Sequence, residues 1–184
     1  MTLIAEKSYT AQDLLNDPNL AGFELVKGQL RERTMSKRSS AIGAKILTLL
    51  FNHASKSHEA NVYPSDLGYD CFPDAGTTVR FADVSVIRAE RDAEAGENPG
   101  YMPIPADLAV EVLSPNDRFN DMGEKVKDYL KAGFGLVWVV DPQWKYVHIY
   151  RRDGSVELLT ADDEITGESA LPSFRCKVNE FFIV

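Results

Sequence analysis

Glu111 is the residue whose type and surroundings most clearly indicate chemistry. It lies inside the apolar run LAVEVL at positions 108–113, which has the length and β-branched content of a buried strand. A carboxylate in such a strand costs free energy unless a cation, a hydrogen-bond donor or a proton compensates its charge. We expect that compensating group to be a metal ion or a lysine. A structural ion pair with Arg80 or Arg118 is the alternative.

Asp83 is a second carboxylate that strand alternation predicts for the same place. It opens the strand-like segment DVSVI at 83–87. If this segment pairs with 108–113, alternation lets Asp83 and Glu111 converge. Two carboxylates and a backbone carbonyl, which we assign to Val112, are hard oxygen ligands that suit Mg²⁺ or Mn²⁺. The structural alternative is that Asp83 is a turn residue at a strand end.

Lys125 and Glu24 complete the predicted site. Lys125 lies beside the apolar stripe of a predicted helix at 119–132, so its stem can follow apolar surface while its ammonium reaches the strand end. There it would orient an attacking water or stabilise developing negative charge. Glu24 would complete the metal shell or bind a second ion. The structural alternatives are a surface pair of Lys125 with Asp121 or Asp128, and a solvated Glu24.

The remaining reactive side chains carry weaker signals. The histidines have no zinc-ligand spacing, and we interpret all three as structural: His53, His58 and His148. Ser114 lacks the flanking glycines of a nucleophile elbow, and we expect it to cap the turn into the following helix, with Asp117 in a similar role. One basic cluster has two interpretations, phosphate contact or a solvated surface; its members are Arg31, Arg33, Lys37 and Arg38.

The segment at 108–140 indicates how the site residues are positioned. Two apolar strands, at 108–113 and 135–141, flank an amphipathic helix at 119–132, so we expect a crossover connection in a mixed sheet. This predicts an α+β fold with an α/β-like core, as a single domain at 1–184. The apolar stripe of the helix is Phe119, Met122, Val126, Tyr129 and Leu130. The other predicted elements are a helix at 10–16, strands at 23–27 and 29–34, a helix at 39–53, a strand or hairpin at 61–70, strands at 77–81 and 83–88, a long loop at 89–105, a hairpin at 145–151 and 155–160, and a short helix at 177–182.

Composition limits the classes of protein that fit. The chain has 184 residues, 44% hydrophobic and 26% charged, as in a globular domain with a sizeable core. Its net charge of −8 argues against a general nucleic-acid coat protein, but not against a nuclease whose acidic site binds cations. No apolar run approaches the ~18 residues of a membrane span, and no signal peptide or disulfide framework is indicated. We therefore expect a cytoplasmic protein in which Cys71 and Cys176 are reduced.

Five segments occur in an order that resembles the Uma-two family of restriction endonucleases, within the PD-(D/E)XK nuclease superfamily. They are FELVKGQL at 23–30, VRFADVSV at 79–86, ADLAVEVLSP at 106–115, EKVKDY at 124–129 and AGFGLVWVVDP at 132–142. The resemblance covers nearly the whole chain, and its most specific part lies at 107–142. It implies a restriction-endonuclease-like core, which is a mixed β-sheet flanked by helices.

The resemblance also implies a role for each candidate residue. Asp83 and Glu111 would be the metal-binding acids, and Glu24 matches an N-terminal acidic position of the family. The catalytic lysine would be Lys125, on the helix that follows the strand. The superfamily pattern would otherwise place a lysine at Leu113.

The implied reaction is hydrolysis of DNA phosphodiester bonds with Mg²⁺ or Mn²⁺ as cofactor, by a homodimer. The sequence departs from the family at Ala82, where proline is usual, and at Ser39, where histidine is frequent. One alternative is a catalytically inactive module of the same fold that binds nucleic acid or a protein partner. Another is a structural protein in which Glu111 is bridged by an arginine.

Overall fold

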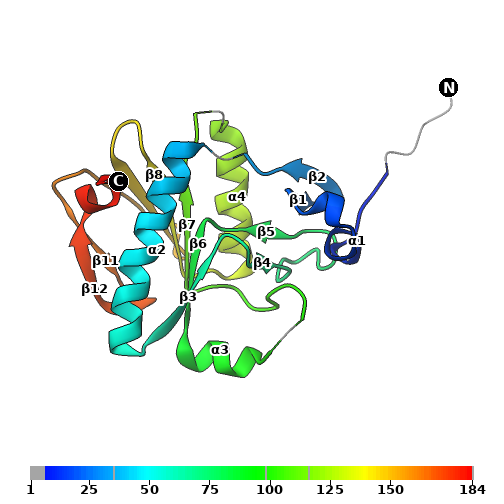
Figure 1. Cartoon of the computed structure of the whole chain (residues 1–184), viewed down its shortest axis with the longest axis horizontal. Coiled ribbons are helices and arrows are strands. Elements are labelled where there is room, and N and C mark those ends of the chain that lie inside the picture. Colours follow the sequence, from blue (N-terminus) through cyan, green and yellow to red (C-terminus); the bar gives the residue numbers. More distant parts are fainter. Residues whose placement is uncertain (1–6, 35, 98, 116, 184) are drawn as a thin grey trace.

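A mixed sheet of six strands forms the centre of the fold (Figure 1). The computed structural model describes residues 7–34, 36–97, 99–115 and 117–183. Strands β7 and β8 are parallel, and the other neighbouring pairs are antiparallel. The predicted mixed sheet and α+β class are therefore confirmed. In spatial order the strands are β10 (Val156–Leu159), β9 (Tyr146–Arg151), β8 (Leu136–Asp141), β7 (Leu108–Val112), β6 (Val84–Arg88) and β3 (Ala60–Pro64).

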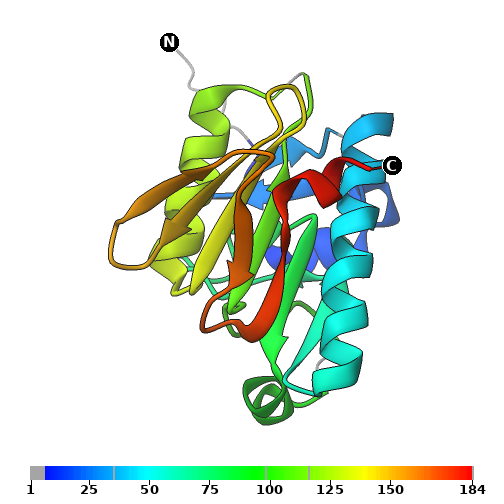
Figure 2. The same cartoon turned by 90° about the vertical axis from the view of Figure 1, so that its left-hand side faces the viewer.

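Two helices cover opposite faces of this sheet (Figure 2). Helix α2 (Lys37–Ser57) packs Ile42 and Ile46 into the core on one face, together with Trp138 of β8. Helix α4 (Phe119–Ala132) covers the other face, where Val137 belongs to a separate core. Because side chains alternate along a strand, the same pattern turns Glu111 of β7 toward α4.

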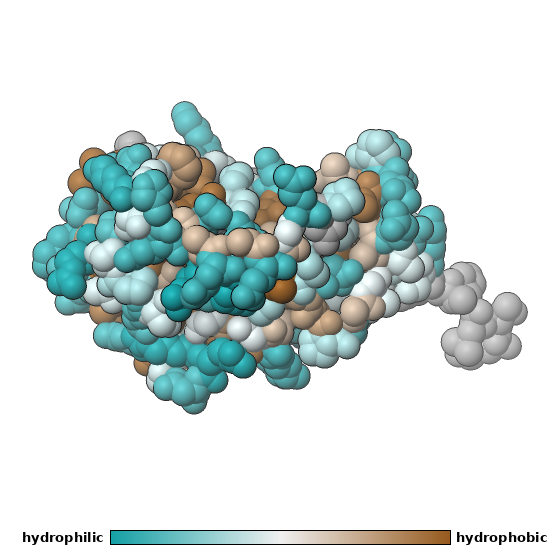
Figure 3. All heavy atoms as spheres, turned by 90° about the horizontal axis from the view of Figure 1, so that it is seen from below, coloured by the Kyte–Doolittle hydropathy of each residue, from teal (hydrophilic) through white to brown (hydrophobic). Residues whose placement is uncertain are grey.

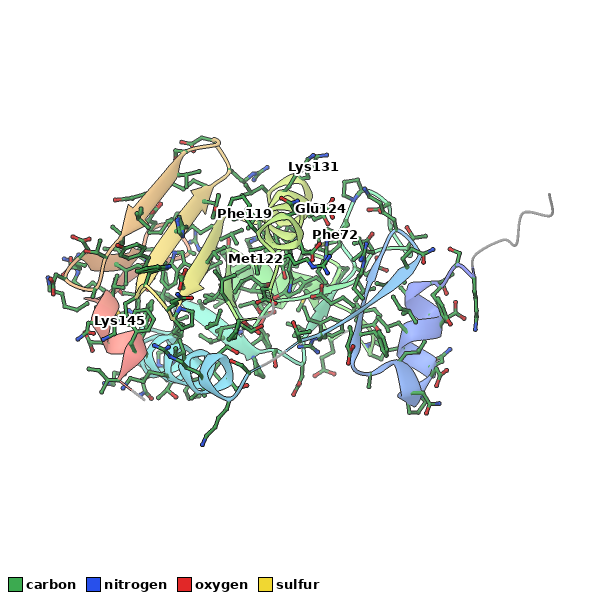
Figure 4. The ribbon with its side chains drawn as sticks, turned by 90° about the horizontal axis from the view of Figure 1, so that it is seen from above. Phe72, Phe119, Met122, Glu124, Lys131 and Lys145 are labelled. Carbon is green, nitrogen blue, oxygen red and sulfur yellow. The ribbon has the colours of Figure 1, made fainter. Side chains whose placement is uncertain are left out.

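Helix α4 connects the two parallel strands, as the sequence predicts. Gly133 ends it with φ 101°, a left-handed conformation that glycine adopts at little cost. Phe119, assigned to the apolar stripe from its spacing, is instead 91% exposed. It is the first residue of the helix, and the fully packed part of α4 begins only at Val126. Figure 4 shows Phe119 projecting from α4 near Met122.

Three small sheets of two strands each surround the central one. The hairpin of β1 and β2 is joined to the rest by Leu25, whose backbone exchanges hydrogen bonds of 3.0 and 2.8 Å with Val79. Helix α1 (Ala11–Asn16) packs on this hairpin through Leu14, and Thr10 caps it as predicted. The small sheets are β1 (Phe23–Val26) with β2 (Gln29–Glu32), β4 (Gly68–Tyr69) with β5 (Arg80–Phe81), and β11 (Glu164–Gly167) with β12 (Leu171–Lys177).

Several predicted boundaries were wrong. Helix α2 is longer than 39–53, because Ser36 begins it with a capping box to Ser39. The segment 61–70 is not one hairpin, since β3 pairs with β6 and β4 with β5. The segment 89–105 is not all loop, because it begins with helix α3 (Ala89–Ala95), a charged helix on a mostly hydrophilic face of the molecule (Figure 3).

The hairpin of β11 and β12 was not predicted at all. Its register shifts between Thr166 and Gly167, and the buried Leu171 and Phe174 are three residues apart. This spacing hides the two-residue period by which strands are recognised. Two short 3₁₀ helices complete the fold, η1 (Pro18–Leu20) and η2 (Val178–Phe182), the second where a short helix was expected. No helix among the described residues is long and apolar enough to cross a membrane.

Candidate active site

Glu111 is buried near the end of β7, as its sequence context predicts. Its side chain is 4% exposed and receives hydrogen bonds from two groups on α4. Tyr129 donates its hydroxyl hydrogen to Oε1 over 2.8 Å, and Lys125 Nζ lies 2.9 Å from Oε1 and 3.0 Å from Oε2. The compensating cation is therefore a lysine, and the alternative of a bridge to Arg80 or Arg118 is wrong.

Asp83 converges with Glu111 through the pairing of β6 and β7. Val84 lies opposite Val110, so continuing the antiparallel register by one residue brings Asp83 opposite Glu111. Both carboxylates line the same pocket. Asp83 Oδ2 accepts a hydrogen bond of 2.7 Å from the N–H of Val112. Val112 itself is not among the described residues that line this pocket, so its predicted contribution through the carbonyl stays a prediction.

Lys125 occupies the centre of the site. Its side chain is only 14% exposed, and Nζ donates to the backbone carbonyl of Phe81 over 2.8 Å. The same atom lies 2.8 Å from Glu24 Oε1, besides its contacts with Glu111. The alternative of a surface lysine paired with an aspartate of its own helix is therefore wrong.

Glu24 is buried and held on both of its oxygens. Oε1 accepts a hydrogen bond of 3.0 Å from the N–H of Phe81, and Oε2 lies 3.1 Å from Arg80. The second terminal nitrogen of Arg80 lies 2.6 Å from Asp128 of α4. The alternative of a solvated Glu24 is wrong, because the residue is 6% exposed and belongs to this buried ion-pair network.

Sequence reasoning missed three members of the site. Tyr129 was assigned to the apolar stripe, and Arg80 and Asp128 were considered only as partners in structural alternatives. Arg80 did give a signal, because it is a charged residue between Val79 and Phe81, inside a segment predicted to be a strand. It is 5% exposed. Like Glu111, an arginine in such a run requires a buried partner of opposite charge.

The pKa values of the three acids in the site are shifted in two directions, upward for Glu111 and Asp83 and downward for Glu24. Burial raises the pKa of Glu111 to about 8, with Asp83 and Glu24 adding to the shift and Lys125 opposing it. Burial also raises the pKa of Asp83. The pKa of Glu24 is lowered, because Lys125 and Arg80 together outweigh the effect of its burial. Although burial opposes it, the neighbouring carboxylates raise the pKa of Lys125, which keeps its ammonium protonated at neutral pH.

The pocket over these residues has a volume of about 320 Å³. Arginines of the β1–β2 hairpin form part of its wall, and the Arg33 guanidinium lies 4.5 Å from the centre of the Phe81 ring. Arg118, Met122 and Glu124 of the α4 side also line it (Figure 4 labels Met122 and Glu124). The basic cluster is therefore divided, since Arg31 and Arg33 line the pocket whereas Lys37 and Arg38 do not.

The rim of the pocket joins two segments that are distant in sequence. Thr34 donates its hydroxyl hydrogen to Asp117 Oδ1 over 3.0 Å, and the N–H of Ser114 donates to Asp117 Oδ2 over 2.7 Å. Ser114 does not cap helix α4, which begins after Arg118 without a side-chain cap. Asp117, for which a similar role is predicted, is the acceptor in this turn.

The oxygen ligands in the pocket fit a small divalent cation. Mg²⁺ is generally bound by one or two carboxylates and keeps several waters, so Asp83 and Glu111 form a sufficient protein contribution. The charge of such an ion would also favour ionised Glu111, whose burial otherwise favours the protonated acid. Among the described residues, no group of three or more histidine, cysteine or acidic side chains is placed to hold a metal.

The histidines and cysteines lie outside this pocket. His53 Nε2 forms a hydrogen bond of 2.8 Å with the hydroxyl of Ser173, which agrees with a structural role. Cys71 and Cys176 are free thiols. Burial raises the pKa of both thiols to about 12, so neither is activated as a nucleophile.

Comparison with known proteins assigns the chain to a family. A family model described as "Putative restriction endonuclease", Uma2, matches residues 9–179. The chain belongs to the Uma2 family. This confirms the resemblance to the Uma-two family, and the matched region of this Uma2 chain contains the whole site described above.

A solved structure supports the fold of this Uma2 chain. It is described as a "putative nuclease belonging to DUF820" from Anabaena variabilis. The two are 20% identical and superpose with a TM-score of 0.79 over 94% of this chain and 97% of the other. At this identity the likeness shows a shared fold. No curated protein matches the chain.

Proposed function

We propose that this Uma2 protein is an endonuclease that hydrolyses DNA phosphodiester bonds with the aid of Mg²⁺ or Mn²⁺. The observation that carries the proposal is the position of Lys125 Nζ, 2.9 Å from Glu111 in a pocket that Asp83 also lines. A lysine beside two convergent carboxylates, the buried Glu111 and the partly buried Asp83, combines a cation site with a fixed positive charge. Membership of a family described as restriction endonucleases supports the same reaction.

Asp83 and Glu111 would hold the metal ion, with the carbonyl of Val112 as a further ligand. A divalent ion in this place lowers the pKa of bound water and stabilises negative charge on a phosphoryl oxygen. The protein fixes the ligands through hydrogen bonds: Val112 N–H holds Asp83 at 2.7 Å, and Tyr129 holds Glu111 at 2.8 Å. Such fixed ligands favour one geometry of the bound phosphate.

Lys125 would stabilise the transition state rather than accept a proton. Its raised pKa keeps the ammonium charged, so it cannot serve as a general base at neutral pH. It can orient the attacking water and offset the charge that develops on the phosphate as the bond to the leaving oxygen breaks. The carbonyl of Phe81 and the carboxylate of Glu24 hold the ammonium in place.

Arg31 and Arg33 would bind the phosphates that flank the scissile bond. Both line the pocket from the β1–β2 hairpin, where guanidinium groups can pair with phosphate oxygens. The net charge of −8 opposes the approach of DNA, so these arginines and the metal ion have to supply the local attraction. A double-strand cut would require two such pockets, which is why the proposal includes a homodimer.

Cleavage of supercoiled plasmid in Mg²⁺ or Mn²⁺ tests the proposal. The variants are Glu111→Gln, Asp83→Asn and Lys125→Ala, with Lys127→Ala as control because Lys127 is an exposed lysine of the same helix. We expect cutting by the wild type and the control, and at least about a 100-fold loss in the other three. Equal cutting by all proteins would exclude this site.

The same experiment separates the nuclease from an inactive binding module. If the folded wild type binds DNA but does not cut it in either metal, the binding module is favoured. The structural alternative is favoured if Glu111→Gln is less stable than the wild type and if neither protein binds a metal or DNA. Sedimentation of the wild type at several protein concentrations tests the homodimer independently.

A further inference from the structure

The ammonium of Lys125 has a partner for each of its hydrogen-bond donors. A lysine carries three N–H groups. In the structure Nζ contacts the Phe81 carbonyl at 2.8 Å, Glu24 Oε1 at 2.8 Å and Glu111 at 2.9 Å. Because all three donors are occupied, a water or a phosphate can be bound by Lys125 only if one of these partners is released.

Two of these partners are fixed by other contacts. The Phe81 carbonyl is part of the backbone of β5. Glu24 is bound by Phe81 N–H at 3.0 Å and by Arg80 at 3.1 Å, and Arg80 is anchored to Asp128 at 2.6 Å. Releasing Glu24 would therefore leave the buried Arg80 and Lys125 without an anion that they share, which is costly.

The third partner, Glu111, is held less completely. Apart from Lys125, the one group in the described chain that hydrogen-bonds to its carboxylate is the hydroxyl of Tyr129, on Oε1. Among the described residues, Lys125 alone binds Oε2, at 3.0 Å. Glu111 is also the acid that lies opposite Asp83. Its carboxyl group can therefore exchange the ammonium for another cation while the contacts of Arg80 with Glu24 and Asp128 stay intact.

We infer that Lys125 is a resident counter-cation which a divalent metal ion displaces from Glu111 but not from Glu24. The inference rests on the proposed function and adds an exchange step to it. When Glu111 passes to the metal, one N–H of Lys125 becomes available to the water or phosphate, while Glu24 keeps the ammonium in position. Glu24 is then a positioning residue for Lys125 and not a metal ligand.

This exchange makes the two cations competitors for the same carboxylate. Part of the intrinsic affinity for the metal is used to displace the ammonium, so removal of the ammonium should tighten metal binding. The proposal therefore predicts opposite effects for one substitution: Lys125→Met abolishes cleavage and increases metal affinity. A lysine whose only role is to stabilise the fold would not produce a gain in affinity.

Titration of the purified protein with MnCl₂ by isothermal calorimetry, without DNA, tests the exchange. We expect Lys125→Met to bind Mn²⁺ about tenfold more tightly than the wild type, which is about 1.4 kcal/mol. Asp83→Asn should bind at least about tenfold more weakly. Lys127→Met is the matched control, because Lys127 is an exposed lysine of the same helix outside the pocket, and the Mn²⁺ affinity of this variant should stay within about threefold of the wild type.

A second variant tests the role of Glu24 and protects against failure to fold. Glu24→Gln/Lys125→Met removes one negative and one positive charge together, so the pocket keeps its charge balance. We expect this double variant to bind Mn²⁺ at least as tightly as the wild type. Binding as weak as in Asp83→Asn would show that Glu24 is a metal ligand and would overturn its positioning role.

The outcomes distinguish this inference from the proposed function. If the wild type cuts DNA and Lys125→Met binds Mn²⁺ no more tightly than the wild type, the exchange is overturned and the nuclease stands. If the affinities follow the prediction but no DNA is cut, the exchange stands and the nuclease falls. If neither the wild type nor the two Lys125 variants bind Mn²⁺, both are overturned.

Discussion

Tyr129 donates its hydroxyl hydrogen to Oε1 of Glu111 over 2.8 Å, linking the last turn of α4 to the end of β7. Both residues are buried, so the contact fixes one carboxylate oxygen of the proposed metal ligand. Outer hydrogen bonds of this kind orient a ligand and tune its affinity. The contact explains why a tyrosine occupies a position in an otherwise apolar stripe.

Tyr129→Phe should therefore lower Mn²⁺ affinity or cleavage rate by about tenfold while leaving the fold intact. The ring remains to pack against its aromatic neighbours, and only the hydroxyl is lost. Tyr63→Phe is the matched control, because the Tyr63 hydroxyl binds Asp92 outside the pocket. Calorimetric titration and initial cleavage rates measure the effect. Identical losses in both variants would argue against a specific role for Tyr129.

The raised pKa of Glu111 predicts how stability depends on pH. The pKa is about 8 in the folded chain against a reference value of 4.5, so the folded state binds more protons between these values. Stability in EDTA should then fall as pH rises through this window, by at most about 1.4 kcal/mol per pH unit. In Glu111→Gln, which mimics the protonated acid, the fall should be smaller. Urea denaturation at several pH values measures both slopes; parallel curves would contradict the shift.

Arg80 should be among the most costly residues of the site to remove. Arg80→Met leaves the partly buried Asp128 without its cation and the buried Glu24 with Lys125 alone, at an expected cost of about 3–5 kcal/mol in the free energy of unfolding. Arg88→Met is the control, since the side chains of Arg88 and Glu90 are 44% and 68% exposed, and it should cost less than about 1 kcal/mol. Chemical denaturation measures both. Similar costs would mean that the buried network contributes nothing beyond a surface pair.

Helix α4 should tolerate a polar residue at its first position. Phe119 is 91% exposed, so Phe119→Ser should change the free energy of unfolding by no more than about 0.5 kcal/mol. Val126 is 5% exposed, and Val126→Ala should cost about 2 kcal/mol through lost burial and a cavity. Thermal and urea denaturation of the two variants compare them. A large loss for Phe119→Ser would assign that side chain a packing role.

The convergence of the main acids could be predicted from the sequence because it depends on local patterns. A charge inside an apolar strand identified Glu111, and alternation placed Asp83 on the facing position once β6 and β7 were paired. Helical periodicity placed Lys125 at the edge of the buried face of α4. Each inference used a period of two or of 3.6 residues, which the sequence displays directly.

The contacts that surround Lys125 could not be predicted in this way. Glu24 reaches the lysine only because a separate two-stranded hairpin docks beside α4, and no local period encodes that docking. The same is true of Arg80, whose partners are 56 and 48 residues away in sequence. Such contacts are set by tertiary packing, which also explains why the ion pairs of Glu24 with Arg80 and Lys125 were not predicted.

The hairpin of β1 and β2 brings Glu24 and two arginines to the pocket, yet it is not part of the central sheet. The Glu24 ion pairs, the Leu25 bridge to Val79, the Gly28 N–H bond to Thr77 and the Thr34–Asp117 hydrogen bond join it to the rest of the chain. A separate unit of this kind can open locally at a lower free energy than the central sheet. Opening would expose Lys125 and dismantle its anchor while the main core stays folded. Amide exchange in the hairpin thus reports what fraction of the molecules has a fully assembled site.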